Sequence, residues 1–231
     1  MRKFELTTDT KMRFGKKLFR IKALIDFGNV KAGEKGGYIE KEENLSQCGN
    51  AWVYGNAWVY GDAEVCGNAW IYGNAEVCGN AEVYGDAEVY GNAWVCGNAK
   101  VYGNAKVCGN AKVCGNAWIY GNAEVCGNAE VYGDAEVYGN AWVCGNAEVC
   151  GNAWVYGNAD YATAKGFGSE YRTTTFFKLK DSNEIGVRCG CFYGTLKEFK
   201  EKVKETHGET KKAKEYLMLA DLMEYRFSEE K

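Results

Sequence analysis

Apolar and polar positions alternate through the middle of the chain in a pattern that repeats every six residues. From Gly49 to Ala162, 114 residues form 19 consecutive hexapeptides of the pattern Gly-Asn/Asp-Ala-X-Val-X, without insertion or deletion. Ala and Val alternate with the variable residues, which is the two-residue period of a β-strand. Gly and Asn or Asp tolerate the positive φ that a tight corner demands. The pattern predicts one short strand and one corner per hexapeptide, with Ala and Val facing an interior.

A unit of six residues is too small to bury its own apolar side chains, so successive hexapeptides must stack into a solenoid. An aliphatic residue followed four positions later by a small one, as in Val53 and Ala57, resembles the left-handed parallel β-helix of the hexapeptide-repeat superfamily. The resemblance implies a left-handed triangular coil of three hexapeptides, or 18 residues. At a strand spacing of ~4.8 Å the shaft is then roughly 30 Å long. Weaker hexapeptides at 37–48 are expected to keep this register, with Ile39 and Leu45 at the Ala position.

Ordinary sequence resumes at both ends of the repeats. Residues 1–44 are expected to form an N-terminal β cap with a strand at 17–24, before the shaft at 45–162. Capping protects the open edge that a solenoid otherwise exposes. Residues 163–231 are expected to form a small α+β domain, with strands at 173–180 and 185–192 around a turn at 181–184. The predicted fold class is therefore mainly β: a left-handed parallel β-helix with two end pieces.

Two helices are expected to complete the C-terminal domain. Thr195 is a good N-cap and Glu198 follows three residues later, which is a capping box. This helix should end at Gly208, and a second helix should span 211–226. The residues that the second helix is expected to bury are Tyr216, Leu217, Leu219, Ala220, Leu222 and Met223.

Composition argues against several classes of protein. The chain contains no proline, which would remove an amide from a continuous parallel ladder. A net charge of -3 gives no general attraction to nucleic acid or to a membrane surface. The first residues lack the apolar run of a signal peptide, and we find no apolar stretch long enough to span a bilayer. We therefore expect a protein of the cytoplasm.

Aromatic side chains dominate the outward positions of the repeats. All seven tryptophans occupy the first outward X position. Exposed aromatic surface of this extent is typical of contact with another subunit, with a terminal segment or with a planar ligand such as a nucleobase. Self-association is expected, and because hexapeptide-repeat proteins are commonly trimers the resemblance favours a homotrimer. The candidate binding or oligomer surface comprises Tyr84, Tyr102, Tyr120, Tyr138, Tyr156, Trp118 and Trp154.

Three lysines, Lys100, Lys106 and Lys112, are the candidate basic contact. A spacing of six places them on three different faces of one coil, so they form a belt. In an 18-residue coil their neighbours along the axis are glutamates or tryptophans. Ion pairs and cation-π contacts account for them, and phosphate binding is the alternative.

Eleven cysteines raise the question of metal or redox chemistry. Columns such as Cys78, Cys96 and Cys114 place thiols one coil apart, in straight lines that cannot surround a tetrahedral zinc ion, and the repeats contain no histidine. We expect free thiols, Cys189-Gly190-Cys191 packed on a strand, and no metal site or cofactor.

No catalytic residue is assigned either. The only histidine, His207, lies near the end of a predicted helix, where a favourable interaction with the helix dipole accounts for it. Acyltransferases of the hexapeptide-repeat superfamily use a histidine base that projects from the solenoid, and the repeats here lack one. The sequence therefore favours a protein that is not an enzyme, with acyl transfer as the weakest alternative.

An internal duplication indicates what the shaft does. Residues 67–99 and 115–147 are identical over 33 positions, offset by 48. Because 48 is not a whole number of 18-residue coils, the second copy carries the same outward pattern rotated to different faces. A finely tuned linear docking surface would not survive that rotation. The shaft is therefore expected to be a spacer or scaffold.

The end pieces and the shaft together resemble small uncharacterised proteins of bacteriophages and prophages. The segments that carry the resemblance are 18–23, 36–45, 190–196 and 205–208. This resemblance implies a viral context and no established activity. Two functions follow as hypotheses: a multimeric scaffold that binds a host or viral protein, or a counter-defence protein that sequesters a nucleotide immune signal at subunit interfaces.

Overall fold

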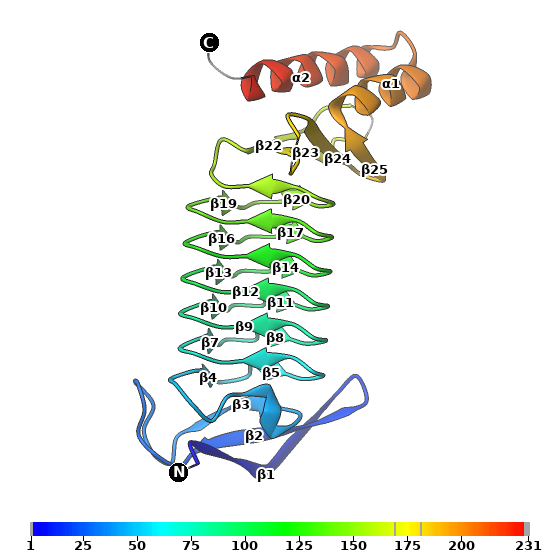
Figure 1. Ribbon diagram of the computed structural model, residues 1–231. Helices are drawn as coiled ribbons and strands as arrows, with labels where there is room; N and C mark the ends of the chain where they lie inside the picture. The colour runs from blue at the N-terminus through cyan, green and yellow to red at the C-terminus, as the bar shows by residue number, and fades with distance from the viewer. Residues whose placement is uncertain (1, 169, 181, 229–231) are drawn as a thin grey trace.

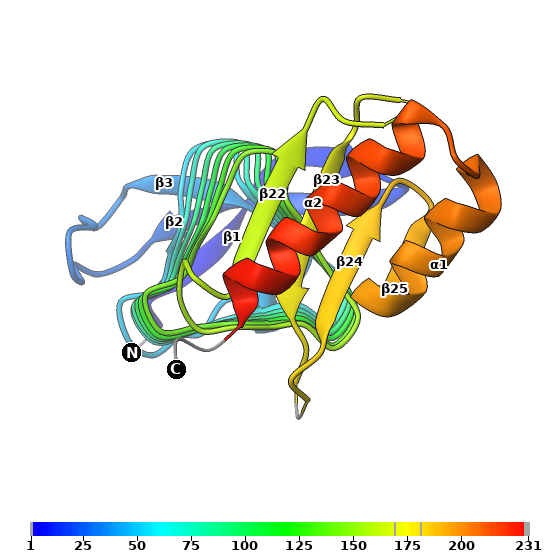
Figure 2. The same ribbon diagram turned by 90° about the horizontal axis from the view of Figure 1, so that it is seen from above.

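The computed structural model describes residues 2–168, 170–180 and 182–228. A β-solenoid lies between an N-terminal cap of antiparallel strands and a C-terminal sheet covered by two helices (Figure 1). Residues 18 apart pair in parallel, as Lys100 pairs with Trp118 and Val101 with Ile119. Seen from above, successive coils superimpose almost completely (Figure 2). The predicted coil of three hexapeptides is confirmed.

Three sheets of nine, six and six strands form the walls of the solenoid, where strands of successive coils pair in parallel. The largest sheet also includes the three strands of the N-terminal cap, which pair antiparallel with one another. Each of the first eighteen hexapeptides contributes one two-residue strand made of an outward residue and the following Val or Ile. The strands are β4 (Trp52–Val53), β5 (Trp58–Val59), β6 (Glu64–Val65), β7 (Trp70–Ile71), β8 (Glu76–Val77), β9 (Glu82–Val83), β10 (Glu88–Val89), β11 (Trp94–Val95), β12 (Lys100–Val101), β13 (Lys106–Val107), β14 (Lys112–Val113), β15 (Trp118–Ile119), β16 (Glu124–Val125), β17 (Glu130–Val131), β18 (Glu136–Val137), β19 (Trp142–Val143), β20 (Glu148–Val149) and β21 (Trp154–Val155).

Backbone hydrogen bonds join each coil to the next at most corners of the shaft. The amide of Asn104 donates to the carbonyl oxygen of Gly121 at 2.8 Å. Gly103 at the same corner has φ +71°, and a Cβ there would lie 3.0 Å from that oxygen. Glycine is therefore required both by conformation and by the closeness of the next coil. From Ala51 to Val155 the Ala and Val side chains of the hexapeptides are at most 1% exposed, as the pattern predicted, whereas Ala159 in the last hexapeptide is exposed.

Side-chain amides form ladders along the corners. Asn104 Nδ2 donates to Asn122 Oδ1 at 2.9 Å, and Asn68 Nδ2 donates to Asp86 Oδ1 at 2.9 Å. Asp86 is thus a member of one of these ladders. Asp62 differs: its carboxylate pairs with Lys41 Nζ at 2.6 Å, because Asn44 below it donates to backbone carbonyls instead.

The N-terminal cap consists of β1 (Phe4–Arg13), β2 (Lys16–Ala23), β3 (Lys35–Ile39) and the short 3-10 helix η1 (Glu42–Asn44). The strand expected at 17–24 is β2, and β1 was not predicted. Ile39 pairs with Val59 and Leu45 with Val65, which are twenty residues apart. The expected register of 37–48 is therefore wrong by two residues, since these bulky side chains continue the Val column, not the Ala column.

The C-terminal module contains the antiparallel strands β22 (Tyr161–Lys165), β23 (Thr173–Lys178), β24 (Ile185–Cys189) and β25 (Phe192–Thr195), then α1 (Leu196–His207) and α2 (Lys211–Phe227). The capping box of Thr195 and Glu198 is confirmed. Leu222 is 56% exposed, so its predicted burial is wrong. The helices cover the face of this sheet that points away from the coils (Figures 1 and 2). Part of the turn expected at 181–184 lies outside the described residues.

Strand β23 fixes the module to the shaft because its side chains alternate between two cores. Phe176 packs with the helices, whereas Phe177 belongs to the core of the solenoid, and both are fully buried. Arg188 Nε contacts Glu148 Oε2 at 2.9 Å, on the last turn of the shaft. Apolar packing and ion pairs together therefore hold the module rigidly on the open end of the solenoid.

Candidate functional site

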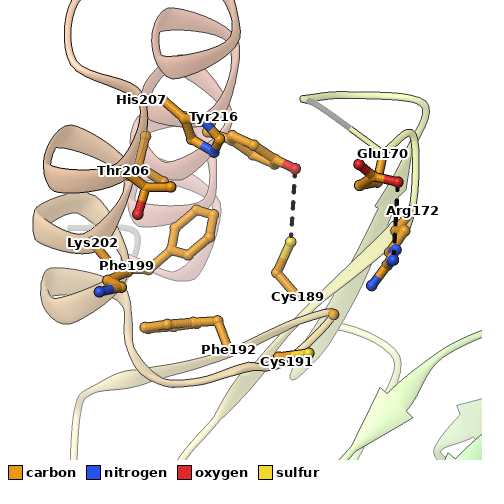
Figure 3. Close-up of a pocket in the computed structure, with 12 residues that line it drawn as sticks. Glu170, Arg172, Cys189, Cys191, Phe192, Phe199, Lys202, Thr206, His207 and Tyr216 are labelled. Atoms are coloured by element: carbon orange, nitrogen blue, oxygen red, sulfur yellow. Dashed lines mark hydrogen bonds and ion pairs between the residues drawn. The ribbon is translucent and has the colours of Figure 1, made fainter.

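A pocket of about 350 Å³ opens between the β24–β25 hairpin, the helices α1 and α2, and the segment before β23 (Figure 3). Its apolar wall is aromatic. The rings of Phe192 and Phe199 have centroids 5.4 Å apart, and Phe199 packs edge-on against Tyr216 at 5.7 Å. His207 stacks on Tyr216 with centroids 5.9 Å apart. The pocket therefore offers flat apolar surface to a bound ring.

Charged groups line the pocket from opposite sides. Lys202 on α1 and Arg172 before β23 lie on opposite sides of the opening, with Glu170 beside Arg172 (Figure 3). Arg172 and Glu170 are 3.9 Å apart, and Lys202 pairs with Glu205 at 2.8 Å. All four side chains are more than half exposed. Exposed pairs of this kind contribute little stability, so both cations can turn toward a bound anion.

The pocket also contains two thiols. Thr174 Oγ1 donates to Cys189 Sγ at 3.2 Å, and the Tyr216 hydroxyl lies 4.0 Å from the same sulfur. Cys191 is exposed in the turn. Gly190 adopts φ +59° and Cys189 pairs with Phe192, so the Cys-Gly-Cys segment is a hairpin turn and not, as expected, a continuous strand.

The arrangement is suited to binding more directly than to nucleophilic catalysis. Within the described part of the chain, His207 has no hydrogen bond to either thiol, and its ring stacks on Tyr216. A cysteine nucleophile needs an adjacent base within hydrogen-bond reach. The sequence placed His207 correctly at the end of α1 but gave no sign of the pocket, because its walls come from four segments without a repeat.

The aromatic surface predicted from the repeats forms a stacked column. Tyr84, Tyr102, Tyr120 and Tyr138 stack with centroids 4.8 to 5.0 Å apart, and Tyr156 continues the column at 5.1 Å with a tilted ring. Burial and the nearby Glu136 carboxylate raise the pKa of the Tyr120 hydroxyl, which donates to Glu136 at 3.1 Å. Tyr120 is therefore neutral at ordinary pH.

The two tryptophans of this surface lie on the sheet beside the column. Trp118 is 41% exposed and Trp154 is 40% exposed. At the C-terminal end of the column, Tyr138, Trp154 and Tyr156 line a second pocket of about 390 Å³, closed by Asp160 and Lys178 at 2.7 Å. The structure thus brings the C-terminal half of the predicted aromatic surface together around a hollow.

The three candidate lysines do not form a site. Lys100 pairs with Glu82 at 3.0 Å, Lys106 with Glu88 at 3.4 Å and Lys112 with Glu130 at 2.9 Å. They lie on three different sheets. Lys100 also lies over the Trp118 ring at 5.9 Å. The predicted belt of ion pairs and cation-π contacts is confirmed.

Sequence reasoning missed a set of diagonal contacts between outward residues sixteen apart. Tyr72 donates to Glu88 at 2.7 Å, and Trp142 Nε1 donates to Cys126 Sγ at 2.9 Å. Each hexapeptide has two outward positions, and the last one on one coil reaches the first one on the next, as diagonal neighbours do in a sheet. The six-residue pattern contains this signal, because the last outward residue of one hexapeptide and the first outward residue of the hexapeptide one coil later are sixteen residues apart.

Comparison of the sequence with known protein families found no match, and comparison with curated proteins also found none. Among the described residues, no helix is both long enough and apolar enough to cross a membrane.

Proposed function

We propose that this is a non-enzymatic binding protein, in which a rigid β-solenoid carries a C-terminal module whose pocket binds a small organic anion with a flat ring. The observation that carries the proposal is the pocket in Figure 3, where an aromatic wall lies between two cationic side chains. Phe177 and Arg188 fasten the module to the shaft, so the pocket is held in a fixed position. A preformed site of this kind loses little entropy when it binds.

Nucleotides are the ligand class that this chemistry favours. A base can stack on the partly exposed ring of Phe192, because every base has a π-face. A phosphate can accept hydrogen bonds from Arg172 and Lys202, and charge-assisted bonds of this type are stronger than neutral ones. Glu170 and Glu205, which now contact these cations, would remain exposed to solvent. The proposal places a nucleotide inside the C-terminal module, not at a subunit interface.

Isothermal titration of the full chain with a panel of mononucleotides and cyclic nucleotides tests the proposal. We expect heat of binding with at least one of them, and about a tenfold loss of affinity in Arg172→Gln and in Lys202→Gln, since each removes one charge-assisted hydrogen bond. Lys204→Gln is the control, because this exposed lysine lies on α1 and does not line the pocket. No heat with any nucleotide, or an equal loss in the control, would contradict the proposal.

The resemblance to phage proteins supplies a biological setting for this ligand. A phage or prophage protein in the cytoplasm of a bacterial host would meet nucleotide signals of bacterial immunity, and binding them tightly would remove them from their receptors. Counter-defence by sequestration is the role we propose in that setting. Cyclic nucleotides are included in the panel for this reason. Acyl transfer is less well supported, since His207 stacks on Tyr216 in the module and no histidine occurs in the shaft.

We also propose that the protein is a homo-oligomer that associates through its aromatic surface, with a trimer favoured. The assembled scaffold can then present several C-terminal modules to a host or viral partner. Exposed Trp118, Trp154 and Tyr156 on one side of the shaft support this. Native mass spectrometry should show a particle of about three times the chain mass of 25.6 kDa. Trp154→Glu should reduce it to the monomer.

Trp94→Glu is the matched control for this measurement. Trp94 is 39% exposed, compared with 40% for Trp154, but it lies on a different sheet. A monomeric wild-type particle would contradict the oligomer and leave the pocket proposal intact. Dissociation by both substitutions would show that the association uses aromatic surface without regard to face.

A further inference from the structure

A column of thiols lies directly after the strands β13, β16 and β19, just before each corner. It consists of Cys108, Cys126 and Cys144. Cys108 is 8% exposed, and its Sγ lies 3.9 Å from Glu124 Oε1. The two sulfurs of Cys108 and Cys126 and a Glu124 carboxylate oxygen all lie within 4.8 Å of one another. The diagonal contact between outward positions brings the carboxylate beside the two thiols.

Glu124 removes the objection that a straight column of cysteines cannot surround a metal ion. Its carboxylate lies off the line of the sulfurs, so the three ligand atoms form a triangle and not a row. Thiolates with a carboxylate are a ligand set that suits Zn²⁺ and the softer Cd²⁺. The hydrogen-bonded coils on either side hold the three side chains in place before any ion binds.

The charges around the triangle favour a cation. Lys106 is the nearest cationic neighbour of Glu124 along the ladder, and it pairs with Glu88 on its other side at 3.4 Å. Trp142 Nε1 donates to Cys126 Sγ at 2.9 Å, a bond that also suits the thiolate form of this cysteine. Among the described residues, no cation forms an ion pair with Glu124.

We propose that Cys108, Cys126 and Glu124 form a binding site for one soft divalent cation, which joins two successive coils of the shaft. A bound Zn²⁺ ion would cross-link residues that are distant in an unfolded chain, and it would therefore also stabilise the fold.

The second thiol column provides an internal control. Cys78, Cys96 and Cys114 are stacked in the same way, but the residue diagonal to Cys96 is Lys112. Lys112 pairs with Glu130 at 2.9 Å, and Glu130 is the carboxylate diagonal to Cys114. A cation in this column would meet a lysine and a carboxylate that is already neutralised. This column is therefore expected to bind the metal more weakly.

The test is a titration of the fully reduced full chain with Cd²⁺ up to and beyond one equivalent, monitored by thiolate-to-cadmium charge-transfer absorption. We expect saturable binding of the first ion, and an affinity at least about tenfold lower in Cys126→Ser and in Glu124→Gln. The matched controls Cys96→Ser and Glu130→Gln should stay within about twofold of wild type. Circular dichroism of each variant establishes that it is folded.

Two results would overturn the proposal. One is the absence of a charge-transfer band with the wild-type chain at less than one equivalent. The other is an equal loss of affinity in the two control variants, which would show that any pair of stacked thiols binds the ion. Glu124→Gln keeps the size of the side chain and leaves every thiol in place, so loss of binding in this variant identifies the carboxylate ligand. Zn²⁺ should raise the melting temperature of wild type and not that of Glu124→Gln.

Discussion

Deletion of eighteen residues from the shaft, 103–120, should give a folded protein that is one coil shorter, whereas deletion of only nine, 103–111, should abolish cooperative folding. The longer deletion joins Tyr102 to Gly121, so every hexapeptide stays intact and every outward residue keeps its column. The shorter one places Lys112 where a corner glycine is needed and turns the following Val residues out of phase with the core. The larger deletion therefore has the smaller effect.

Thermal unfolding followed by circular dichroism gives the measurement. In a repeat protein, stability is approximately a sum over repeats and their interfaces. Loss of one coil out of about seven should cost roughly 1–2 kcal/mol of a typical total of 5–15, and so lower the melting temperature by about 2–8 °C. The nine-residue variant should show no cooperative transition. If instead it melts like wild type and the eighteen-residue variant does not, the coil does not contain 18 residues.

Deletion of six residues, 103–108, is the intermediate control. It retains complete hexapeptides, so the solenoid should form, but each later residue moves to the next face. The Tyr column would then be interrupted above Tyr102, and the C-terminal module would point in a new direction relative to the N-terminal cap. Its stability is expected to lie between those of the other two variants.

The shaft was predictable because one pattern is repeated on every coil. The outward Lys100 and the buried Val101 have the same roles as their neighbours 18 residues away, so a single register decides them all. The ends have no such repetition. Ile39 occupies the Val column, since the chain enters the first coil from a hairpin and passes through η1 before the next corner. Nothing in the hexapeptide pattern encodes that two-residue offset.

The candidate sites differ in the same respect: those built from the repeat could be predicted from the sequence, and those built by packing could not. The Tyr84 to Tyr156 column follows from the period alone and is confirmed as a stack. The pocket around Phe192 and Arg172 depends on how a hairpin, two helices and a connecting segment pack, which local patterns do not determine. The contact of Cys108 with Glu124 lies between these cases. It is fixed by the repeat, but only when neighbours at 16 residues are considered together with those at 18.

Substitution of one interior valine, Val131→Asp, should cost about 4–5 kcal/mol or more, because Val131 is fully buried and its neighbours along the column are Val113 and Val149. A carboxylate at this point has no partner inside the prism, and burying an unpaired charge is among the most costly single changes. The whole of a marginal stability can be lost in this way. Urea unfolding followed by circular dichroism should show a large fall in the midpoint, or no folded baseline.

Glu130→Asp is the matched control, since it introduces the same residue one position earlier on the same strand. Glu130 points outward and pairs with Lys112 at 2.9 Å. Shortening it weakens an exposed ion pair, which is worth at most about 1 kcal/mol. A difference of several kcal/mol between adjacent positions would follow directly from the two-residue alternation of the strand. Equal effects of the two substitutions would mean that position 131 does not face a closed apolar core, and the arrangement of the three sheets would then be wrong.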